Sequence, residues 1–300
     1  MVEFIHTSDW HLGNPFSAFS EEQQLRLAEA RFEGITRLFS YARSKGVRLL
    51  LAAGDQIDNG ELRDTSVLLR LFGIISRFPE IQVVMIPGNH DPLSSGSIYS
   101  RVDDSSYPAN LLFVRRPQSL DLPDLGIRIL AAPLLERFGR VNPIVSLAAE
   151  SVPDEGVVTI GLAHGSLAVS DRVGGESDGF PVPPTLARDQ GIDYLALGDW
   201  HSYLKSGDRT FYPGTHEALT FGDDAGSLHV RIAGAGHRPE ALRIDRSVMC
   251  WRELRRTLRD ESLDAFLLEW GGGDRDASGP DLGPLFSAGG GRVDVGKGTS

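Results

Sequence analysis

The chain has 300 residues, of which 41% are hydrophobic, and its 41 acidic against 30 basic residues give a formal net charge of −11. This length and apolar content allow one or two soluble domains and argue against disorder of the whole chain. The acidic balance argues against a protein that coats nucleic acid through a broad surface, because that mode of binding requires many Lys and Arg side chains.

Short apolar runs rich in β-forming residues alternate along the chain with segments of helical period. The runs predicted as buried strands span residues 2–6, 48–53, 82–86, 127–131, 157–163, 194–197 and 210–212. Runs of this length that are apolar throughout are typical of strands covered on both faces. The pattern therefore predicts a sheet whose strands are largely parallel.

Two helices are predicted between the first three of these strands. The first spans residues 20–45, opens with a capping box made by Ser20 and Gln23, and stops at Gly46. Its apolar residues recur every three or four positions and should share one buried face. They are Leu25, Ala28, Phe32, Ile35, Phe39 and Ala42. The second helix is predicted over residues 64–78.

Strands that alternate with helices predict an α/β fold, in which the chemistry sits on loops at the carboxyl ends of the strands. The composition changes near residue 247, and the last thirty residues are rich in glycine. We therefore divide the chain into a catalytic domain at 1–245, a partial C-terminal element at 246–270, and a tail at 271–300 that we expect to be disordered.

The sequence also carries information about the cellular compartment. The single cysteine, Cys250, cannot form a disulfide within the chain. The N-terminal residues lack the charged and apolar regions of a signal peptide, and no apolar run approaches the ~20 residues that span a bilayer. We expect a cytoplasmic protein without membrane insertion.

Five of the predicted strands are each followed at once by a loop that presents Asp, His or Asn. These loops are Ser8–His11, Gly54–Asp58, Gly88–Asp91, His164–Gly165 and Gly198–His201. One such loop is ordinary, because Asp after a strand commonly caps a turn. Five in series indicate a metal site, and their carboxylate, imidazole and amide groups suit two divalent ions such as Mn²⁺, Fe²⁺ or Zn²⁺. A metal site carries its own positive charge and can attract a phosphate to an acidic protein.

Glycine precedes the candidate ligand in three of these loops. Gly54, Gly88 and Gly198 stand where a strand must turn sharply and bring the next side chain over the end of the sheet. The repeated order of strand, glycine and ligand makes the pattern specific.

The motif series resembles that of the calcineurin-like metallophosphoesterase superfamily. It reads Asp-x-His, Gly-Asp-x-x-Asp, Gly-Asn-His-Asp, His-Gly and Gly-x-x-His, and it covers residues 4–201. Within the superfamily, residues 4–13, 86–91, 193–198 and 212–215 look like segments of SbcD-type DNA repair exonucleases. The resemblance implies layered β-sheets flanked by helices, here with a truncated C-terminal cap.

The resemblance implies two groups of metal ligands. One metal would be held by Asp9, His11 and His201, the other by Asn89, His164 and Asp199, and Asp55 would bridge them. A shared carboxylate also makes sense by charge, because it offsets the repulsion between two dications ~4 Å apart. The family usually places a histidine at the position of Asp199. A carboxylate there hardens the site, so we expect Mn²⁺, or Mg²⁺, to be favoured over Zn²⁺ more than in a histidine-containing site.

The resemblance further implies a general acid for the leaving group. His90 resembles that acid, and Asp58 is expected to orient its ring and favour its protonated form. The alternative for His90 is a structural residue beside the metals. Asp91 either tunes the acid or caps the next turn. His216, which follows a Pro-Gly-Thr turn, is expected to be an exposed loop histidine rather than a substrate contact.

The leading hypothesis is a metal-dependent phosphodiester hydrolase, a DNA exonuclease or endonuclease of the SbcD type in DNA repair. Asn59 favours a diester substrate, because phosphoprotein phosphatases of the superfamily carry a phosphate-clamping arginine at that position. The alternatives are a small-substrate phosphodiesterase or broad phosphatase without DNA activity, and a non-catalytic interaction module on the same fold. By resemblance, the expected partners are DNA, an SbcC-type ATPase and a second copy in a homodimer.

Overall fold

A computed structural model describes residues 1–151, 156–168, 179–220, 223–249 and 251. The chain divides into two compact units, one made of residues 1–14 and 30–251 and the other of residues 15–29 and 252–300. All the predicted metal ligands belong to the first unit. The predicted C-terminal element at 246–270 and the tail at 271–300 fall almost entirely outside the described residues.

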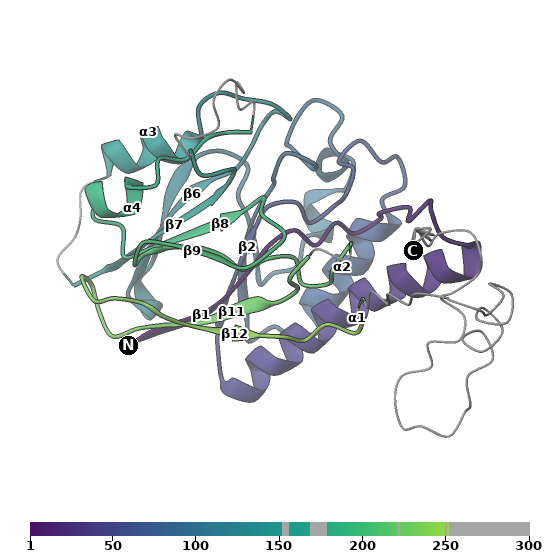
Figure 1. Ribbon diagram of the computed structural model, residues 1–300, viewed down its shortest axis with the longest axis horizontal. Coiled ribbons are helices and arrows are strands. Elements are labelled where there is room, and N and C mark those ends of the chain that lie inside the picture. The colour runs from purple at the N-terminus through teal and green to yellow at the C-terminus, as the bar shows by residue number, and fades with distance from the viewer. Residues whose placement is uncertain (152–155, 169–178, 221–222, 250, 252–300) are drawn as a thin grey trace, which may run out of the picture. The chain divides into compact units, whose positions relative to one another are not determined.

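Twelve strands in the described part of the chain form two sheets of six strands (Figure 1). The first sheet contains β1 (Val2–Thr7), β2 (Leu49–Ala53), β3 (Gln82–Ile86), β4 (Leu111–Phe113), β11 (Ser227–Ile232) and β12 (Glu240–Ile244). The second contains β5 (Gln118–Leu122), β6 (Ile127–Ala132), β7 (Val158–His164), β8 (Tyr194–Gly198), β9 (Leu204–Ser206) and β10 (Thr210–Tyr212). The strand orders are β12-β11-β1-β2-β3-β4 and β5-β6-β7-β8-β10-β9.

Four neighbouring strands of each sheet run parallel. β1, β2, β3 and β4 are parallel neighbours in the first sheet, and β6, β7, β8 and β10 are parallel neighbours in the second. Antiparallel strands extend these parallel sets: β11 and then β12 continue the first sheet beyond β1, and β5 and β9 form the two edges of the second. Parallel pairing brings the carboxyl ends of neighbouring strands to one edge, which is where the predicted ligands follow.

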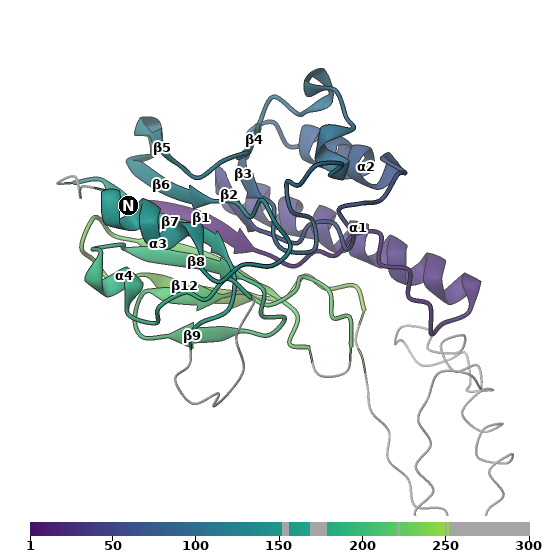
Figure 2. The same cartoon turned by 90° about the horizontal axis from the view of Figure 1, so that it is seen from above.

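The helices are α1 (Glu21–Lys45), α2 (Ser66–Ser76), α3 (Pro143–Glu150) and α4 (Leu186–Asp189), with 3₁₀ turns at Ile98–Ser100, Asp104–Ser106 and Pro123–Leu125. The part of α1 from Ala30 onward and α2 cover the outer face of the first sheet, while α3 and α4 cover that of the second (Figure 2). None of the helices in the described part of the chain combines the length and the apolar character of a membrane-spanning segment.

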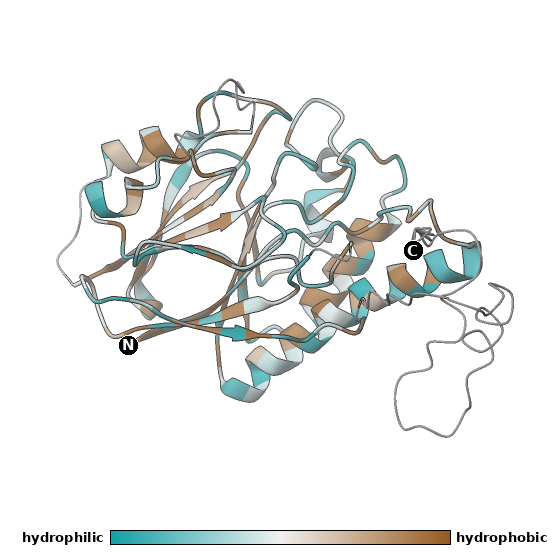
Figure 3. Ribbon diagram, in the orientation of Figure 1, coloured by the Kyte–Doolittle hydropathy of each residue, from teal (hydrophilic) through white to brown (hydrophobic). Residues whose placement is uncertain are grey.

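The apolar residues follow this layering. One cluster fills the space between the two sheets, with Phe4 and Leu51 from one side and Ile160 and Ala196 from the other. Of the strands that contribute to it, β2, β7 and β8 are apolar along most of their length (Figure 3). Burial of both faces explains why their sequences read as continuous apolar runs instead of alternating ones.

Each of the seven predicted strands is present, with ends that differ by at most one residue. The capping box is also present, because Ser20 N donates to Gln23 Oε1 over 3.1 Å and Gln23 N donates to Ser20 Oγ over 3.4 Å. The prediction for Leu25 was wrong, since its side chain is 69% exposed. The second helix begins two residues later and ends two residues earlier than predicted.

Candidate metal centre

The predicted ligands follow the carboxyl ends of five strands and meet at one edge of the two sheets. Asp9, His11 and His201 bring ligand atoms within 4.8 Å of one another, and so do Asp9, Asp55 and His164. His164 Nε2 lies 2.8 Å from Asn89 Oδ1 and 4.0 Å from Asp199 Oδ1. The structure therefore gathers all seven side chains, while their division between two metals stays a prediction.

Asp55 lies between the two predicted groups. Its Oδ2 is 3.8 Å from His11 Nε2, in the first group, and 3.4 Å from His164 Nε2, in the second. Asp55 is 2% exposed, so the carboxylate is held away from bulk water. This position suits an oxygen shared by two cations.

Several of these residues have a strained backbone. Six non-glycine residues of the described chain have positive φ, and four of them are predicted ligands. Their φ angles are 53° at Asp9, 41° at His11, 56° at Asp55 and 106° at Asp199. A non-glycine residue held in such a conformation costs about 1–3 kcal/mol, and such residues cluster at functional sites.

The glycines before the ligands leave room for neighbouring loops. A Cβ atom at Gly88 would meet the Asp55 carboxylate, and one at Gly54 would meet the ring of His164. Gly54 also has a φ of 90°, a conformation that glycine adopts without a steric penalty. The close approach of the β2, β3 and β7 loops therefore requires glycine at these positions.

Two histidines direct their free ring nitrogen toward the centre. His11 Nδ1 donates to Asp58 Oδ1 over 3.0 Å, and His164 Nδ1 donates to the Ala53 main-chain oxygen over 2.7 Å. Each bond assigns the proton to Nδ1 and leaves Nε2 with a lone pair. Histidines that bind metals are commonly oriented in this way by a carboxylate or a main-chain oxygen.

The charges of the site suit divalent cations. Burial raises the pKa of Asp9, and the neighbouring charge of Asp55 raises it further. Burial opposes protonation of His164, but Asp55, Asp9 and Asp199 outweigh that effect and raise its pKa well above the ordinary value. The buried carboxylates favour a proton on the lone pair of the histidine, which faces the centre. A cation bound at the same point can take the place of that proton. The donor set thus fits divalent metal ions.

Asp199 has a partner that the sequence did not indicate. Ser166 Oγ donates to Asp199 Oδ2 over 2.5 Å, and Asp199 N donates to Asp9 Oδ1 over 3.1 Å. The Ser166 hydroxyl occupies one carboxylate oxygen and leaves Oδ1 facing His164. Ser166 follows the His-Gly motif by one residue, and only its position in space links it to Asp199.

His90 and Asp58 are hydrogen-bonded to each other, but through the Asp58 main chain and not, as expected, through its carboxylate. His90 Nδ1 donates to the Asp58 main-chain oxygen over 3.0 Å. The Asp58 carboxylate instead accepts from His11 Nδ1 and from Asn14 Nδ2, each over 3.0 Å. The Asp58 side chain therefore orients a predicted metal ligand, while its main chain orients His90. With Nδ1 committed, Nε2 is the His90 atom that can exchange a proton with a substrate.

Asp91 organises the ligand loops. Its carboxylate accepts from the main-chain nitrogens of Gly88, Asp55 and Ile57 over 2.7, 3.2 and 3.0 Å. The Tyr99 hydroxyl donates to it over 2.5 Å. Of the two roles left open by the sequence, turn capping describes these contacts. Tyr99 itself was missed, because no motif marks it.

The expectation that His216 is exposed was wrong. Its side chain is buried, and its Nε2 donates to the Arg31 main-chain oxygen over 2.8 Å. Burial and the nearby charge of Arg31 lower the pKa of His216 well below the ordinary value. A neutral buried ring in this position is part of the packing beneath the site.

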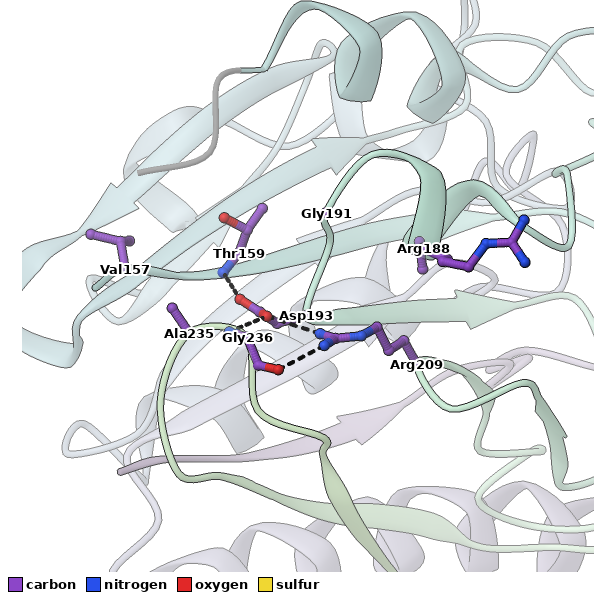
Figure 4. Close-up of a pocket in the computed structure, with 9 residues that line it drawn as sticks. Val157, Thr159, Arg188, Gly191, Asp193, Arg209, Ala235 and Gly236 are labelled. Carbon is purple, nitrogen blue, oxygen red and sulfur yellow. Dashed lines mark hydrogen bonds and ion pairs between the residues drawn. The ribbon is translucent and has the colours of Figure 1, made fainter. Parts of the chain in front are cut away.

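A pocket of about 370 Å³ lies at the other end of the second sheet (Figure 4). Its lining includes Thr159 near the start of β7 and Asp193 just before β8, whereas the predicted ligands follow the ends of those strands. Asp193 accepts from Thr159 N, Arg209 Nη1 and Gly236 N over 3.0, 2.9 and 2.8 Å. These polar groups satisfy one another, so we interpret the pocket as a structural junction.

Comparison with known proteins places these observations in a family context. The family model described as calcineurin-like phosphoesterase matches residues 2–203. The chain is 26% identical over 240 residues to an uncharacterized metallophosphoesterase, YhaO, of Bacillus subtilis strain 168, covering 78% of this chain and 55% of that protein. It is 32% identical over 95 residues to a subunit of the nuclease SbcCD of Rhodobacter capsulatus, covering 30% of this chain and 22% of that protein. The chain thus spans about half or less of the length of these curated relatives.

Similar solved structures include TT1561 of Thermus thermophilus, with 11% identity, a TM-score of 0.48, and coverage of 81% of this chain and 98% of that one. Another is purple acid phosphatase PPD1 from yellow lupin seeds, with 12% identity, a TM-score of 0.43, and coverage of 76% of this chain and 49% of that one.

Proposed function

Because this chain belongs to the calcineurin-like phosphoesterase family, we propose that it is a metal-dependent phosphodiester hydrolase that acts on DNA. The observation that carries the hydrolase assignment is the convergence of seven ligand side chains and His90 from five strand ends. The similarity to part of an SbcCD nuclease supports DNA as the substrate. An SbcC-type ATPase partner and a role in DNA repair belong to the same proposal.

Different residues would have different roles in hydrolysis. Asp9, His11 and His201 would hold one cation, Asn89, His164 and Asp199 the other, and Asp55 both. When bound, the ions supply an activated water and a positive field for the phosphate oxygens. Asp58 keeps His11 in the tautomer whose Nε2 faces the centre.

His90 is the proposed general acid. Its Nδ1–H donates to the Asp58 main-chain oxygen, so Nε2 is the ring atom left to pass a proton to the leaving oxygen of the substrate. Its ring packs edge-to-face on His11 at a centroid distance of 4.8 Å, which fixes the ring plane beside the ligands. Protonating the leaving group matters most for a poor leaving group such as a deoxyribose hydroxyl.

The exposed Trp200 of a ligand loop, together with Phe138 on a loop that is hydrogen-bonded to another, favours a nucleic-acid substrate over a small one. Trp200 stands between Asp199 and His201 and is 47% exposed, and Phe138 is 64% exposed on the loop that follows β6. That loop is tied to the centre, because Asn142 Nδ2 donates to the His164 main-chain oxygen over 2.8 Å. Exposed aromatic rings next to a phosphate site can stack on unpaired bases.

The test is hydrolysis of end-labelled single- and double-stranded DNA with Mn²⁺, Mg²⁺ or Zn²⁺, alongside a bis-nitrophenyl phosphodiester. We expect metal-dependent DNA cleavage that is lost in H90A with metal content retained. H237A is the matched control, because His237 is exposed on the turn between β11 and β12. Turnover of the nitrophenyl diester with intact DNA would instead identify a small-substrate phosphodiesterase. Loss of bound metal in H90A would reassign His90 to structure.

A further inference from the structure

Arg31 is a buried cation directly behind the ligand loop that follows β1. Its side chain is 2% exposed, and burial lowers its pKa to about 10. Within the described chain, the acceptors of its hydrogen bonds are main-chain oxygens and one hydroxyl, with no carboxylate among them. Burying a charged group without a direct ion pair is costly, so the arrangement calls for a reason beyond packing.

The partners of Arg31 are the main chain of the ligand loop. Nε donates to the Trp10 oxygen over 2.7 Å, and Nη2 donates to the Asp9 oxygen over 3.4 Å. Trp10 lies between the predicted ligands Asp9 and His11. The guanidinium therefore holds the two peptide units that join these ligands.

Thr215 extends the same contacts to the third ligand of this group. Its hydroxyl accepts from Arg31 Nη2 over 3.3 Å, and its single hydrogen faces the Asp9 oxygen at 2.7 Å and the Glu217 oxygen at 2.8 Å. Its main-chain N donates to the His201 oxygen over 3.2 Å. Arg31 and Thr215 thus reach the main chain around Asp9, His11 and His201, and these contacts do not extend to Asn89, His164 or Asp199.

The ligand loop has a physical need for such support. Asp9 and His11 both have left-handed backbone conformations, which persist only when surrounding contacts fix them. The supports are themselves fixed. His216 donates to the Arg31 oxygen, and Gly214, with a φ of 86°, makes the turn that places Thr215.

We propose that Arg31 and Thr215 form a positioning clamp for one of the two metals, the one assigned to Asp9, His11 and His201. This inference rests on the two-metal centre of the proposed function but not on DNA as the substrate. The other metal depends on separate supports, namely the Ala53 oxygen behind His164 and the Ser166 hydroxyl beside Asp199. The clamp therefore predicts that the two sites can be weakened independently.

The experiment is Mn²⁺ titration of metal-free protein by calorimetry, with the manganese spectrum recorded by electron paramagnetic resonance. T215V removes the hydroxyl at nearly constant volume, and T215S keeps it. T210V is the matched control, because Thr210 is also a buried threonine but lies in β10 outside the clamp. Loss of a residue that orients a ligand lowers metal affinity by roughly 10–100-fold.

We expect the wild type, T215S and T210V to bind two ions and to show a spin-coupled pair. T215V should bind one ion with unchanged affinity and the other at least about tenfold more weakly, so that an uncoupled spectrum appears at one equivalent. R31K, which can reach only one of the oxygens, should weaken the same ion and serves as a second variant if T215V unfolds. A circular dichroism melt in EDTA checks folding.

Two outcomes would overturn the clamp. Equal weakening of both ions in T215V, or no weakening of either, would refute it while leaving a two-metal hydrolase intact. Binding of fewer than two ions by the wild type would overturn the clamp and the two-metal centre together. Because DNA is absent from the titration, failure to cleave DNA has no bearing on this result.

Discussion

Replacing Asp91 by asparagine tests the finding that this side chain holds the ligand loops together. The carboxylate faces four donors: Gly88 N and Asp55 N at Oδ1, and Ile57 N and the Tyr99 hydroxyl at Oδ2. In D91N, one oxygen can still accept, but the amide group turns N–H bonds toward the other two donors. A buried donor that loses its acceptor costs about 1–3 kcal/mol. We expect D91N to lose about 2–6 kcal/mol of unfolding free energy, a large part of the 5–15 kcal/mol typical of a folded domain.

The assay is urea unfolding of wild type and D91N in EDTA, followed by circular dichroism. EDTA separates the stability of the fold from that supplied by bound metal. Y99F is the matched control, because it removes a single donor, and D91N should cost less in the Y99F background than in the wild type. A loss of less than about 1 kcal/mol in D91N would refute the reasoning, since it would mean that a neutral side chain satisfies these donors equally well.

Three further predictions concern the metal, the pH dependence and the substrate. D199H should shift competitive binding from Mn²⁺ toward Zn²⁺, because imidazole suits Zn²⁺ better than a carboxylate does, and an unchanged preference would contradict the role given to Asp199. Burial raises the pKa of Glu217 to about 7, because the folded state favours the neutral carboxyl group. The Glu217 side chain therefore stabilises the fold below the ordinary pKa of a glutamate, and this contribution is lost as the pH rises through 7. The unfolding free energy of wild type relative to E217Q should therefore fall by about 2–3 kcal/mol between pH 4.5 and pH 7.5, and a flat difference would place the Glu217 pKa near its ordinary value. W200A should raise KM for single-stranded DNA by roughly tenfold, and an abasic site at the cleaved nucleotide should abolish that effect if the indole stacks on the base.

The sequence was a good guide wherever one short segment carries the whole signal. The strands at 49–53 and 158–164 are buried on both faces, so a continuous apolar run is enough to identify them. The strands β4, β5, β9, β11 and β12 were missed, because they are very short or because polar residues interrupt their apolar pattern. Leu25 shows the opposite error, in which helical spacing placed an exposed side chain on a buried face.

The same division holds for the candidate site. The ligands were predicted because each follows a strand directly and family motifs mark it. Arg31, Tyr99 and Ser166 were not, because each meets the site through contacts between residues distant in sequence. Asp58 falls between these cases. Its proximity to His90 was predicted, but the partner of its carboxylate depends on where the β1 loop brings His11.

By itself, the sequence predicted which residues are candidates for the metal site and its chemistry, since motif spacing and strand ends are local properties that fix residue type and order. The tertiary structure decided how those residues are supported. The left-handed backbones at Asp9 and His11 and the buried charge of Arg31 are stable only as parts of one packed arrangement. Hydrogen bonds among β1, α1 and the turn before Thr215 join residues up to 206 positions apart. No local pattern encodes contacts of that range, because each depends on the packing of the layers between them.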